Sequence, residues 1–153
     1  MKIKYSMLFC AALLVGCATT GLAPTKALNF TMISPDFKIS DAGFLKTSSN
    51  STNLQVYSSG MSLLDVNIKD KVCYNSVCKE ELEFNQNFFK REHYRGFFKD
   101  LLTKKPIYES RNLVKTSCGF DQNLTNLSYQ ICDNTMSFKD TKNGVKIIIR
   151  ELN

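Results

Sequence analysis

Cysteine is the residue in this sequence with the widest range of chemistry, and six are present. A thiol can close a disulfide, bind a metal, carry out redox exchange or accept a covalent group. The cysteine spacings are not those of a zinc site and the chain has one histidine, so no metal site is predicted. Thioredoxin-like redox motifs are CxxC, whereas four residues separate Cys73 from Cys78. Structural and attachment roles are therefore favoured for the cysteines at positions 10, 17, 73, 78, 118 and 132.

Cys17 stands at the end of an apolar run near the N-terminus. Lys2 and Lys4 precede the run "SMLFCAALLVG" (6–16), which is too short for a bilayer-spanning helix of about 20 apolar residues. This pattern predicts a secretory signal peptide. The stretch "LVGC" (14–17) resembles the lipobox of bacterial lipoproteins, in which a branched apolar residue and a small residue stand ahead of the cysteine.

The lipobox resemblance implies that the signal is cut before Cys17, that its thiol takes a diacylglyceryl group, and that its new amine is acylated, with palmitate as the expected type of chain. Two or three acyl chains give effectively permanent attachment, because each buried CH₂ contributes about 0.8 kcal/mol. The resemblance also implies sorting by the residue after the cysteine, and Ala18 at that position favours the outer membrane, with the domain on its periplasmic face or on the cell surface. The alternative is an ordinary signal peptide cut near "CATTGLA", which leaves Cys17 without a role.

The domain organisation predicted from these features has three parts. Residues 1–16 are the lipoprotein signal peptide, and 17–28 are the lipidated N-terminus and a small, polar tether. Residues 29–153 are a single β-rich periplasmic domain, because a composition with 43% hydrophobic and 22% charged residues is typical of one globular unit at this length. Removal of 1–16 lowers the net charge from +6 to +4, which does not favour a nucleic-acid partner.

The cysteines beyond the signal and the anchor are predicted to form two disulfides. Cys10 leaves with the signal, and an even number of cysteines remains in a compartment that is oxidising. Four cysteines allow three pairings. The local scheme, Cys73 with Cys78 and Cys118 with Cys132, is favoured because turn-forming residues lie between the first two.

No constellation of side chains in the sequence favours catalysis, so the chain is predicted not to be an enzyme and to need no cofactor. His93 is expected to be solvated near the start of a helix rather than to act as a general base. Glu80, Glu81 and Glu83 are a charge run at a helix start, where negative charge is favourable. A second charge run is expected on the solvated side of a helix, with contact to anionic lipid or an acidic partner as the sharper alternative; its members are Lys90, Arg91, Arg95, Lys99, Lys104 and Lys105.

The elements that would position these groups are mostly strands. Alternation of apolar and polar residues predicts strands in 29–33, 36–40, 44–48, 54–60, 63–70 and 127–132, and a hairpin over 135–152 with Asn143-Gly144 in its turn. One segment has helical spacing and ends before Pro106. Its apolar residues are predicted to cover the sheet, with contact to lipid or to a partner as the alternative role, and they are Tyr94, Phe97, Phe98, Leu101 and Leu102. The predicted fold is mainly β (α+β): a curved antiparallel sheet or half-open barrel, with one or two helices covering its apolar face.

Asn123 carries a possible modification signal. In "DQNLT" (121–125) an acidic residue stands two places before the asparagine, and this extended sequon resembles the acceptor of the bacterial oligosaccharyltransferase of Campylobacter-like organisms. The Lys-, Asn- and Phe-rich composition is typical of such a host. Asn123 is expected in an exposed loop between two cysteines.

The order of elements resembles that of the Lol-type receptors and carriers of bacterial lipoproteins. The similarity rests on "VYSSGMSLLDVNIKD" (56–70), "REHYRGFFKDLLTKKPI" (91–107) and "MSFKDTKNGVKIIIREL" (136–152). It implies a half-open barrel with helices as a lid, whose apolar hollow holds acyl chains. The sequence as a whole leaves three alternative functions. They are a non-catalytic envelope lipoprotein with a structural or interaction role, a lipoprotein-handling receptor, and an inhibitor that presents "CYNSVC" (73–78) to a periplasmic hydrolase.

Overall fold

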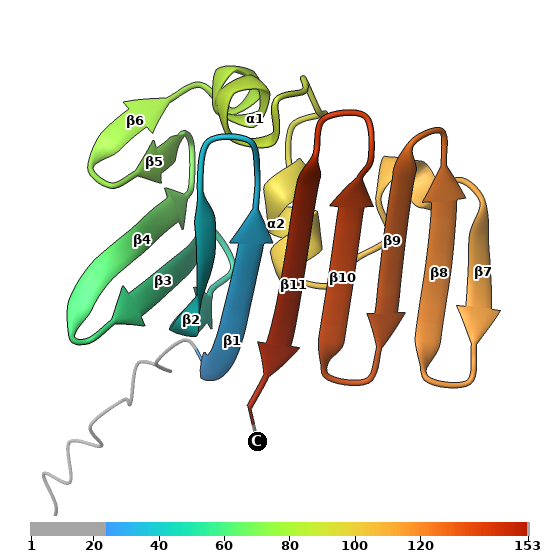
Figure 1. Cartoon of the computed structure of the whole chain (residues 1–153), viewed down its shortest axis with the longest axis horizontal. Coiled ribbons are helices and arrows are strands. Elements are labelled where there is room, and N and C mark those ends of the chain that lie inside the picture. Colours follow the sequence, from blue (N-terminus) through green and yellow to red (C-terminus); the bar gives the residue numbers. More distant parts are fainter. Residues whose placement is uncertain (1–23, 153) are drawn as a thin grey trace, which may run out of the picture.

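The computed structural model describes residues 24–152, which form one antiparallel sheet and two short helices (Figure 1). The first strands are β1 (Thr25–Ile33), β2 (Lys38–Thr47), β3 (Thr52–Ser58), β4 (Met61–Ile68), β5 (Val72–Tyr74) and β6 (Val77–Lys79). The helices follow as α1 (Glu81–Phe89), α2 (Phe97–Leu102) and a short turn, η1 (Tyr108–Ser110). The chain ends with β7 (Leu113–Thr116), β8 (Gly119–Leu124), β9 (Leu127–Cys132), β10 (Thr135–Asp140) and β11 (Val145–Glu151).

The sheet has eleven strands in the order β6-β5-β4-β3-β2-β1-β11-β10-β9-β8-β7. Neighbouring strands are joined by hairpins except at the centre, where the first strand of the chain pairs with the last. The sheet does not close, because β6 and β7 are its two edges. The prediction of a mainly antiparallel β fold with covering helices is confirmed, and the sheet is an open one.

One face of the sheet is covered and the other is open. Leu28, Phe30 and Met32 of β1 are completely buried, whereas Asn29 between them is exposed. This alternation puts every second residue of a strand on the core side. Helix α2 lies over that side (Figure 1), where Phe97 contacts Phe138 of β10 with ring centroids 5.5 Å apart. The strands and the helices therefore share one core.

The two helices have the local signals that a short helix needs. Glu81 and Glu83 lie in the first turn of α1, as expected for negative charge at a helix start, and Lys90 ends the helix in the left-handed region. Helix α2 is shorter than predicted. Gly96 precedes it with φ +90°, a backbone conformation outside the helical region, so Tyr94 lies before the helix and not in it.

The boundaries of the first strands differ from the prediction in two places. β1 begins at Thr25 and Leu28 is completely buried, so the last residues of the predicted tether belong to the sheet. The two strands predicted in 36–40 and 44–48 are one continuous strand, β2. A Cβ at Gly43 would lie 2.4 Å from the backbone oxygen of Gln55, so glycine permits the close approach of β3. Residues 1–23, with Cys10 and Cys17, lie outside the described residues.

The C-terminal strands follow the predicted pattern and extend it. β9, β10 and β11 lie where alternation placed them, and a four-residue turn over 141–144 joins the last two. β5 and β6 were not predicted, and neither were β7 and β8, whose residues do not alternate cleanly between buried and exposed positions. Within residues 24–152, neither helix has the length and apolar character that crossing a membrane would require.

Candidate functional site

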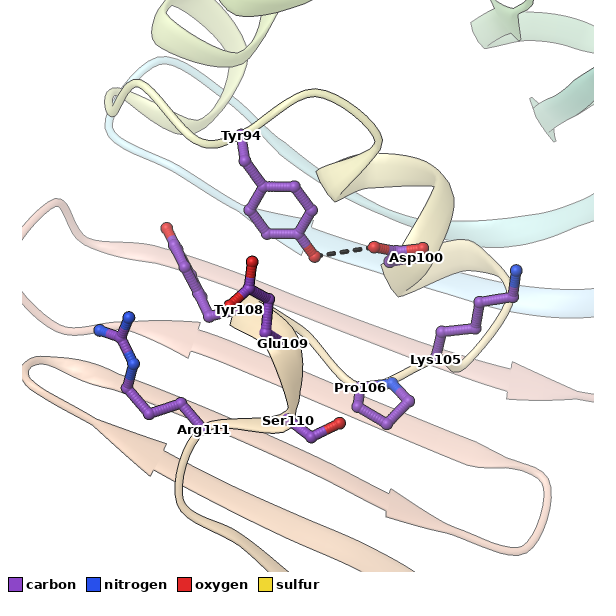
Figure 2. Close-up of a pocket in the computed structure, with 8 residues that line it drawn as sticks. All are labelled: Tyr94, Asp100, Lys105, Pro106, Tyr108, Glu109, Ser110 and Arg111. Carbon is purple, nitrogen blue, oxygen red and sulfur yellow. Dashed lines mark hydrogen bonds between the residues drawn. The ribbon is translucent and has the colours of Figure 1, made fainter.

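A surface cleft of about 560 Å³ lies between α2 and the segment that leads to β7 (Figure 2). Tyr94 stands on one side of it, and its hydroxyl donates a hydrogen bond to Oδ2 of Asp100 at 2.8 Å. Burial and this bond to a carboxylate raise the pKa of Tyr94, so its hydroxyl stays protonated. The other lining residues come from the connecting segment and are Lys105, Pro106, Tyr108, Glu109, Ser110 and Arg111.

The floor of this cleft is a left-handed turn. Tyr108, Glu109 and Ser110 have φ values of +47°, +56° and +61°, a conformation that costs an L-residue about 1–2 kcal/mol at each position. The amides of Ser110 and Arg111 donate to the carbonyl oxygens of Ile107 and Tyr108, each at 3.1 Å. Three consecutive strained residues persist only where the surrounding structure holds them in place.

Gln122 of β8 supplies that support. Its side chain is buried, with 1% exposure, and it bonds the backbone on both sides of the turn. Its Oε1 accepts from the amide of Ile107 at 2.8 Å, and its Nε2 donates to the carbonyl oxygens of Ile107 and Arg111 at 3.0 and 2.8 Å. One buried amide therefore fixes the shape of the cleft floor against the sheet.

His93 is buried beneath the same turn, and the prediction that it is solvated is wrong. Its side chain has 1% exposure, and the ring stacks on Phe97 with centroids 3.7 Å apart and planes 3° from parallel. Nδ1 lies 2.6 Å from the Tyr108 hydroxyl, and Nε2 has no hydrogen-bond partner among the described residues. The charged residues next to His93 in the sequence suggested that its side chain is solvated. In the structure the ring packs among aromatic side chains, and its charged neighbours are partly or fully exposed.

Burial makes His93 a neutral ring. Desolvation lowers its pKa from 6.5 to about 4, the Arg91 charge adds to this shift, and the Asp140 carboxylate opposes it. Asp140 is itself buried at the end of β10, where its carboxylate accepts from the amides of Lys142 and Asn143 at 3.0 and 3.1 Å. The imidazole is therefore a fixed part of the core under neutral conditions.

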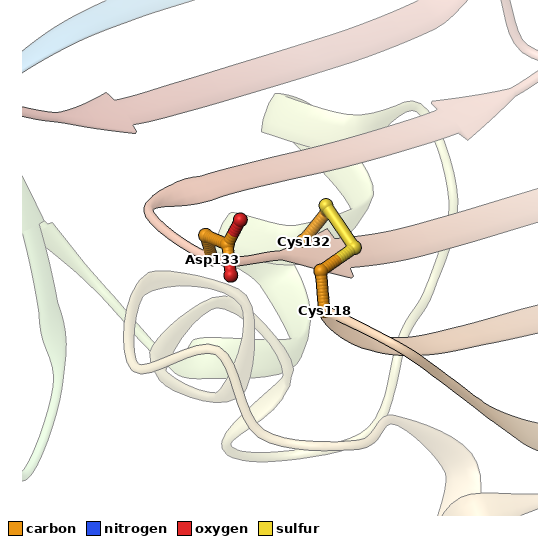
Figure 3. A group of neighbouring side chains, drawn as sticks. All are labelled: Cys118, Cys132 and Asp133. Atoms are coloured by element: carbon orange, nitrogen blue, oxygen red, sulfur yellow. A yellow bond between two sulfur atoms is a disulfide. The ribbon is translucent and has the colours of Figure 1, made fainter.

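Both predicted disulfides are present. Cys73 and Cys78 are directly opposite each other across β5 and β6, and Cys118 joins the end of β9 at Cys132. Figure 3 shows the second bond beside Asp133, the one grouping of residues within 24–152 that has the proximity of metal ligands. Its two sulfur atoms are bonded to each other, so neither is a thiolate donor in this state. The group is a covalent link between the β7–β8 turn and the end of β9 rather than a metal centre.

The predicted helix residues pack against the sheet. Phe97, Phe98, Leu101 and Leu102 have exposures of 0 to 2%, and Tyr94 is half-buried beside them. The structure brings them together as the cover of the core, which is the first of the two roles predicted for them. In this conformation they do not face solvent, so contact with a lipid or partner would require the helix to leave the sheet.

The predicted charge run is divided among several ion pairs. Lys90 pairs with Asp36, Arg91 lies 3.8 Å from Asp140, Arg95 lies 3.8 Å from Glu80, and Lys104 lies 3.0 Å from Glu151. These partners come from different parts of the sheet and helices. The run is therefore distributed over the surface and does not form one basic stripe on a helix.

Asn123 lies in β8, opposite Ser128 of β9, and not in the loop that was predicted. Its side chain is exposed, as expected, and its backbone oxygen accepts from Nδ2 of Asn112 at 3.0 Å. Polar residues are found in loops and also on the solvent-exposed face of an antiparallel sheet. The polar residues around Asn123 therefore did not distinguish a loop from a strand.

A second surface pocket, of about 330 Å³, lies between α1 and the β5–β6 hairpin. Phe37, Tyr74 and Val77 form its apolar wall together with two phenylalanines of α1, and Val77 is 59% exposed. Lys79 and Lys90 stand at its rim, each paired with an acidic residue.

Sequence reasoning missed the left-handed turn and the glutamine that holds it. The turn contains no glycine, asparagine or aspartate, the residues that most often adopt positive φ; its residues are Tyr108, Glu109 and Ser110. Gln122 stood inside a polar segment with no periodic pattern. No family model matches this sequence, and no curated protein is significantly similar to it.

Proposed function

We propose that this chain is a lipid-anchored lipoprotein of the bacterial cell envelope, with a structural or interaction role and no catalytic activity. The observation that carries the interaction role is the filled space between the sheet and its helices. Five phenylalanines of α1 and α2 occupy it with exposures of 0 to 6%: Phe84, Phe88, Phe89, Phe97 and Phe98. A core filled in this way favours binding at the surface over enclosure of a ligand.

The disulfides support an address outside the cytoplasm. Two disulfides lie at opposite ends of the sheet, one in the β5–β6 hairpin and one between the β7–β8 turn and the end of β9. Such bonds form and persist in oxidising compartments such as the periplasm. This agrees with the signal peptide and lipobox that the N-terminal sequence resembles.

The state of the single histidine supports a non-catalytic role. A general base must reach the proton it removes, with a pKa near the working pH. His93 is buried, its Nδ1 is engaged by Tyr108, and its pKa is lowered to about 4. This side chain is arranged for packing.

The anchor is tested by metabolic labelling with a palmitate analogue in a bacterial host. The full chain is expected to carry the label, Cys17→Ser to lose it, and Cys10→Ser to keep it, because Cys10 leaves with the signal. Fractionation of the labelled cells then locates the protein, with the outer membrane expected. Unchanged labelling of Cys17→Ser, or a mature chain that begins beyond Cys17, would refute the anchor.

A lipoprotein-handling role is the second candidate, favoured by the open antiparallel sheet with covering helices and by the apolar pocket at Tyr74 and Val77. Its test is transfer of a lipoprotein from a loaded periplasmic carrier to the full chain with its disulfides intact, followed by native mass spectrometry. Transfer would identify a receptor and make the α2 residues mutational targets. No transfer, and no co-purified lipid, would leave the interaction role.

A further inference from the structure

A smaller pocket, of about 220 Å³, adjoins the cleft and shares Tyr108 and Arg111 with it. Its remaining lining residues are Arg91, Asn112, Leu124, Thr125 and Leu127. Two arginines, two hydroxyl groups and an amide thus stand against two leucines. The lining of the pocket is therefore both polar and aliphatic.

The guanidinium groups of Arg91 and Arg111 have N–H donors that are available to a ligand. Arg91 lies 3.8 Å from the Asp140 carboxylate, which is too long for a hydrogen bond. That carboxylate already accepts from the backbone amides of Lys142 and Asn143, and from Nδ2 of Asn143 at 2.7 Å. Arg111 is exposed, and no residue within 24–152 forms an ion pair with it.

Both positive charges act on one point of the pocket. Burial raises the pKa of the Tyr108 hydroxyl and the Asp140 carboxylate acts in the same direction, while Arg91 and Arg111 each act to lower it. The two guanidinium groups therefore lie within electrostatic range of the same hydroxyl, although they are 20 positions apart in the sequence. An anion beside Tyr108 would interact with both.

The backbone around Arg111 is fixed before any ligand arrives. Arg111 follows the left-handed turn, Asn112 after it has φ +55°, and Gln122 holds the Arg111 carbonyl oxygen. Strain of this kind is characteristic of preorganised sites, since a rigid site loses less entropy on binding. The structure thus maintains a costly conformation where one of the two arginines stands.

We infer that Arg91 and Arg111 form a binding site for a carboxylate carried on a short aliphatic group. The guanidinium groups would take the carboxylate oxygens, as planar arginine donors do, and Leu124 and Leu127 would contact the aliphatic part. A wholly polar anion such as phosphate would leave Leu124 and Leu127 without an apolar partner. The C-terminus of a peptide and a free branched-chain acid share this chemistry. The inference gives the proposed interaction role a ligand class, and it rests on that role.

The test is a titration of the full chain in a neutral detergent, followed by NMR of the arginine Nε–H groups. The main probe is N-acetyl-leucine, with its amide as the uncharged match, 4-methylpentanoate as the free acid, and inorganic phosphate. The acid is expected to shift the Arg91 and Arg111 signals and to bind about tenfold or more tightly than the amide, because charge-assisted hydrogen bonds are lost with the charge. Equal binding of 4-methylpentanoate would indicate a free acid as the natural ligand, and weaker binding a peptide terminus.

The matched variants are Arg111→Gln and Arg150→Gln. Arg111 contributes to the turn only through its backbone, so its substitution is expected to preserve the fold. Arg150 is an exposed arginine on β11, away from the pocket lining. Arg111→Gln should weaken N-acetyl-leucine binding about tenfold or more, and Arg150→Gln should leave it unchanged.

Three results would overturn the inference: no carboxylate binding, equal binding of N-acetyl-leucine and its amide, or phosphate binding as tight as that of N-acetyl-leucine. Equal loss in both arginine variants would do the same. Palmitate labelling at Cys17 is read in a separate experiment, so the anchor and the carboxylate site can fail independently.

Discussion

On β3 and β4, side chains alternate between two environments. Leu54 and Val66 face the helices and are completely buried, whereas Asn53 and Asp65 face the open side, where Nδ2 of Asn53 donates to Oδ1 of Asp65 at 2.9 Å. The same alternation continues across the sheet to β10 and β11. Burial of apolar area stabilises the covered face, and hydrogen bonds exposed to water contribute far less on the open face.

Both disulfides lie on the open face of the sheet, which has no core. Val72 and Ile131 face the covered side, so their neighbours Cys73 and Cys132 face the open side. A protein with one core layer and eleven strands exposes much of each strand, and cross-links limit the freedom of its unfolded chain. The two faces therefore use different sources of stability.

The largest expected effect compares one substitution on the two faces. Phe97→Ala on the covered face should lower the free energy of unfolding by about 3–5 kcal/mol, because it leaves a cavity in the core. Phe44→Ala on the open face should lower it by about 1 kcal/mol or less, since Phe44 is 47% exposed and contacts Tyr57 alone among the aromatic rings. Urea unfolding with intact disulfides measures both. Similar losses would break the distinction between the faces.

The titration of His93 tests whether water is excluded from the core on the covered face. The pKa of His93 is about 4 in the folded chain and about 6.5 in the unfolded chain, so its contribution to stability is complete above pH 6.5 and is lost as the pH falls from 6.5 to 4. The full loss is about 3 kcal/mol. Because the chain has one histidine, the Hε1 signal of its imidazole reports the titration by NMR.

A midpoint near 6.5 for that signal would mean that water reaches the ring. His93→Gln provides the control for stability. Subtracting its free energy of unfolding from that of the natural chain at each pH removes the contribution of the carboxylates. That difference should change between pH 6.5 and 4 and stay constant above pH 7.

The disulfides test the open face. Cys118 and Cys132 are separated by 14 positions, and replacing both by alanine should cost about 3 kcal/mol on the loop-entropy model. Cys73 and Cys78 are separated by 5 positions, and the same change should cost about 2 kcal/mol. Urea unfolding of the two double variants gives the difference. A larger loss for the shorter loop would show that the β5–β6 hairpin depends on its bond for its fold.

The smallest expected effect on stability belongs to Asn123. The open face tolerates substitution, so Asn123→Gln should change the free energy of unfolding by about 0.5 kcal/mol or less. In cells with the bacterial oligosaccharyltransferase, the same variant should lose the mass of a glycan. Asn126→Gln, two positions before Ser128 in a plain sequon, is the matched control and should keep it. A glycan retained on Asn123→Gln would exclude this position.

Much of the sheet was predictable because alternation is a local signal of burial on one face. Met136, Phe138 and Ile147 lie in a repeat of two residues, and all three are buried as that pattern predicts. The cysteine pairing was predictable for a similar reason, since both bonds join positions close in sequence. The candidate site was not predictable, because its parts come from the helix connection, the left-handed turn and β8.

Most of the longer strands, the hairpin at Asn143-Gly144 and the favoured disulfide pairs could be predicted from the sequence, since each depends on residues within one or two neighbouring elements. Three features follow only from the packed fold: the burial of His93, the positive φ of Tyr108 to Ser110, and the pocket that Arg91 and Arg111 share. Each of these depends on a contact made across the fold, by Phe97, by Gln122 or by the meeting of two segments. A local pattern does not encode such contacts, because their free energy exists only when the sheet and its helices have packed together.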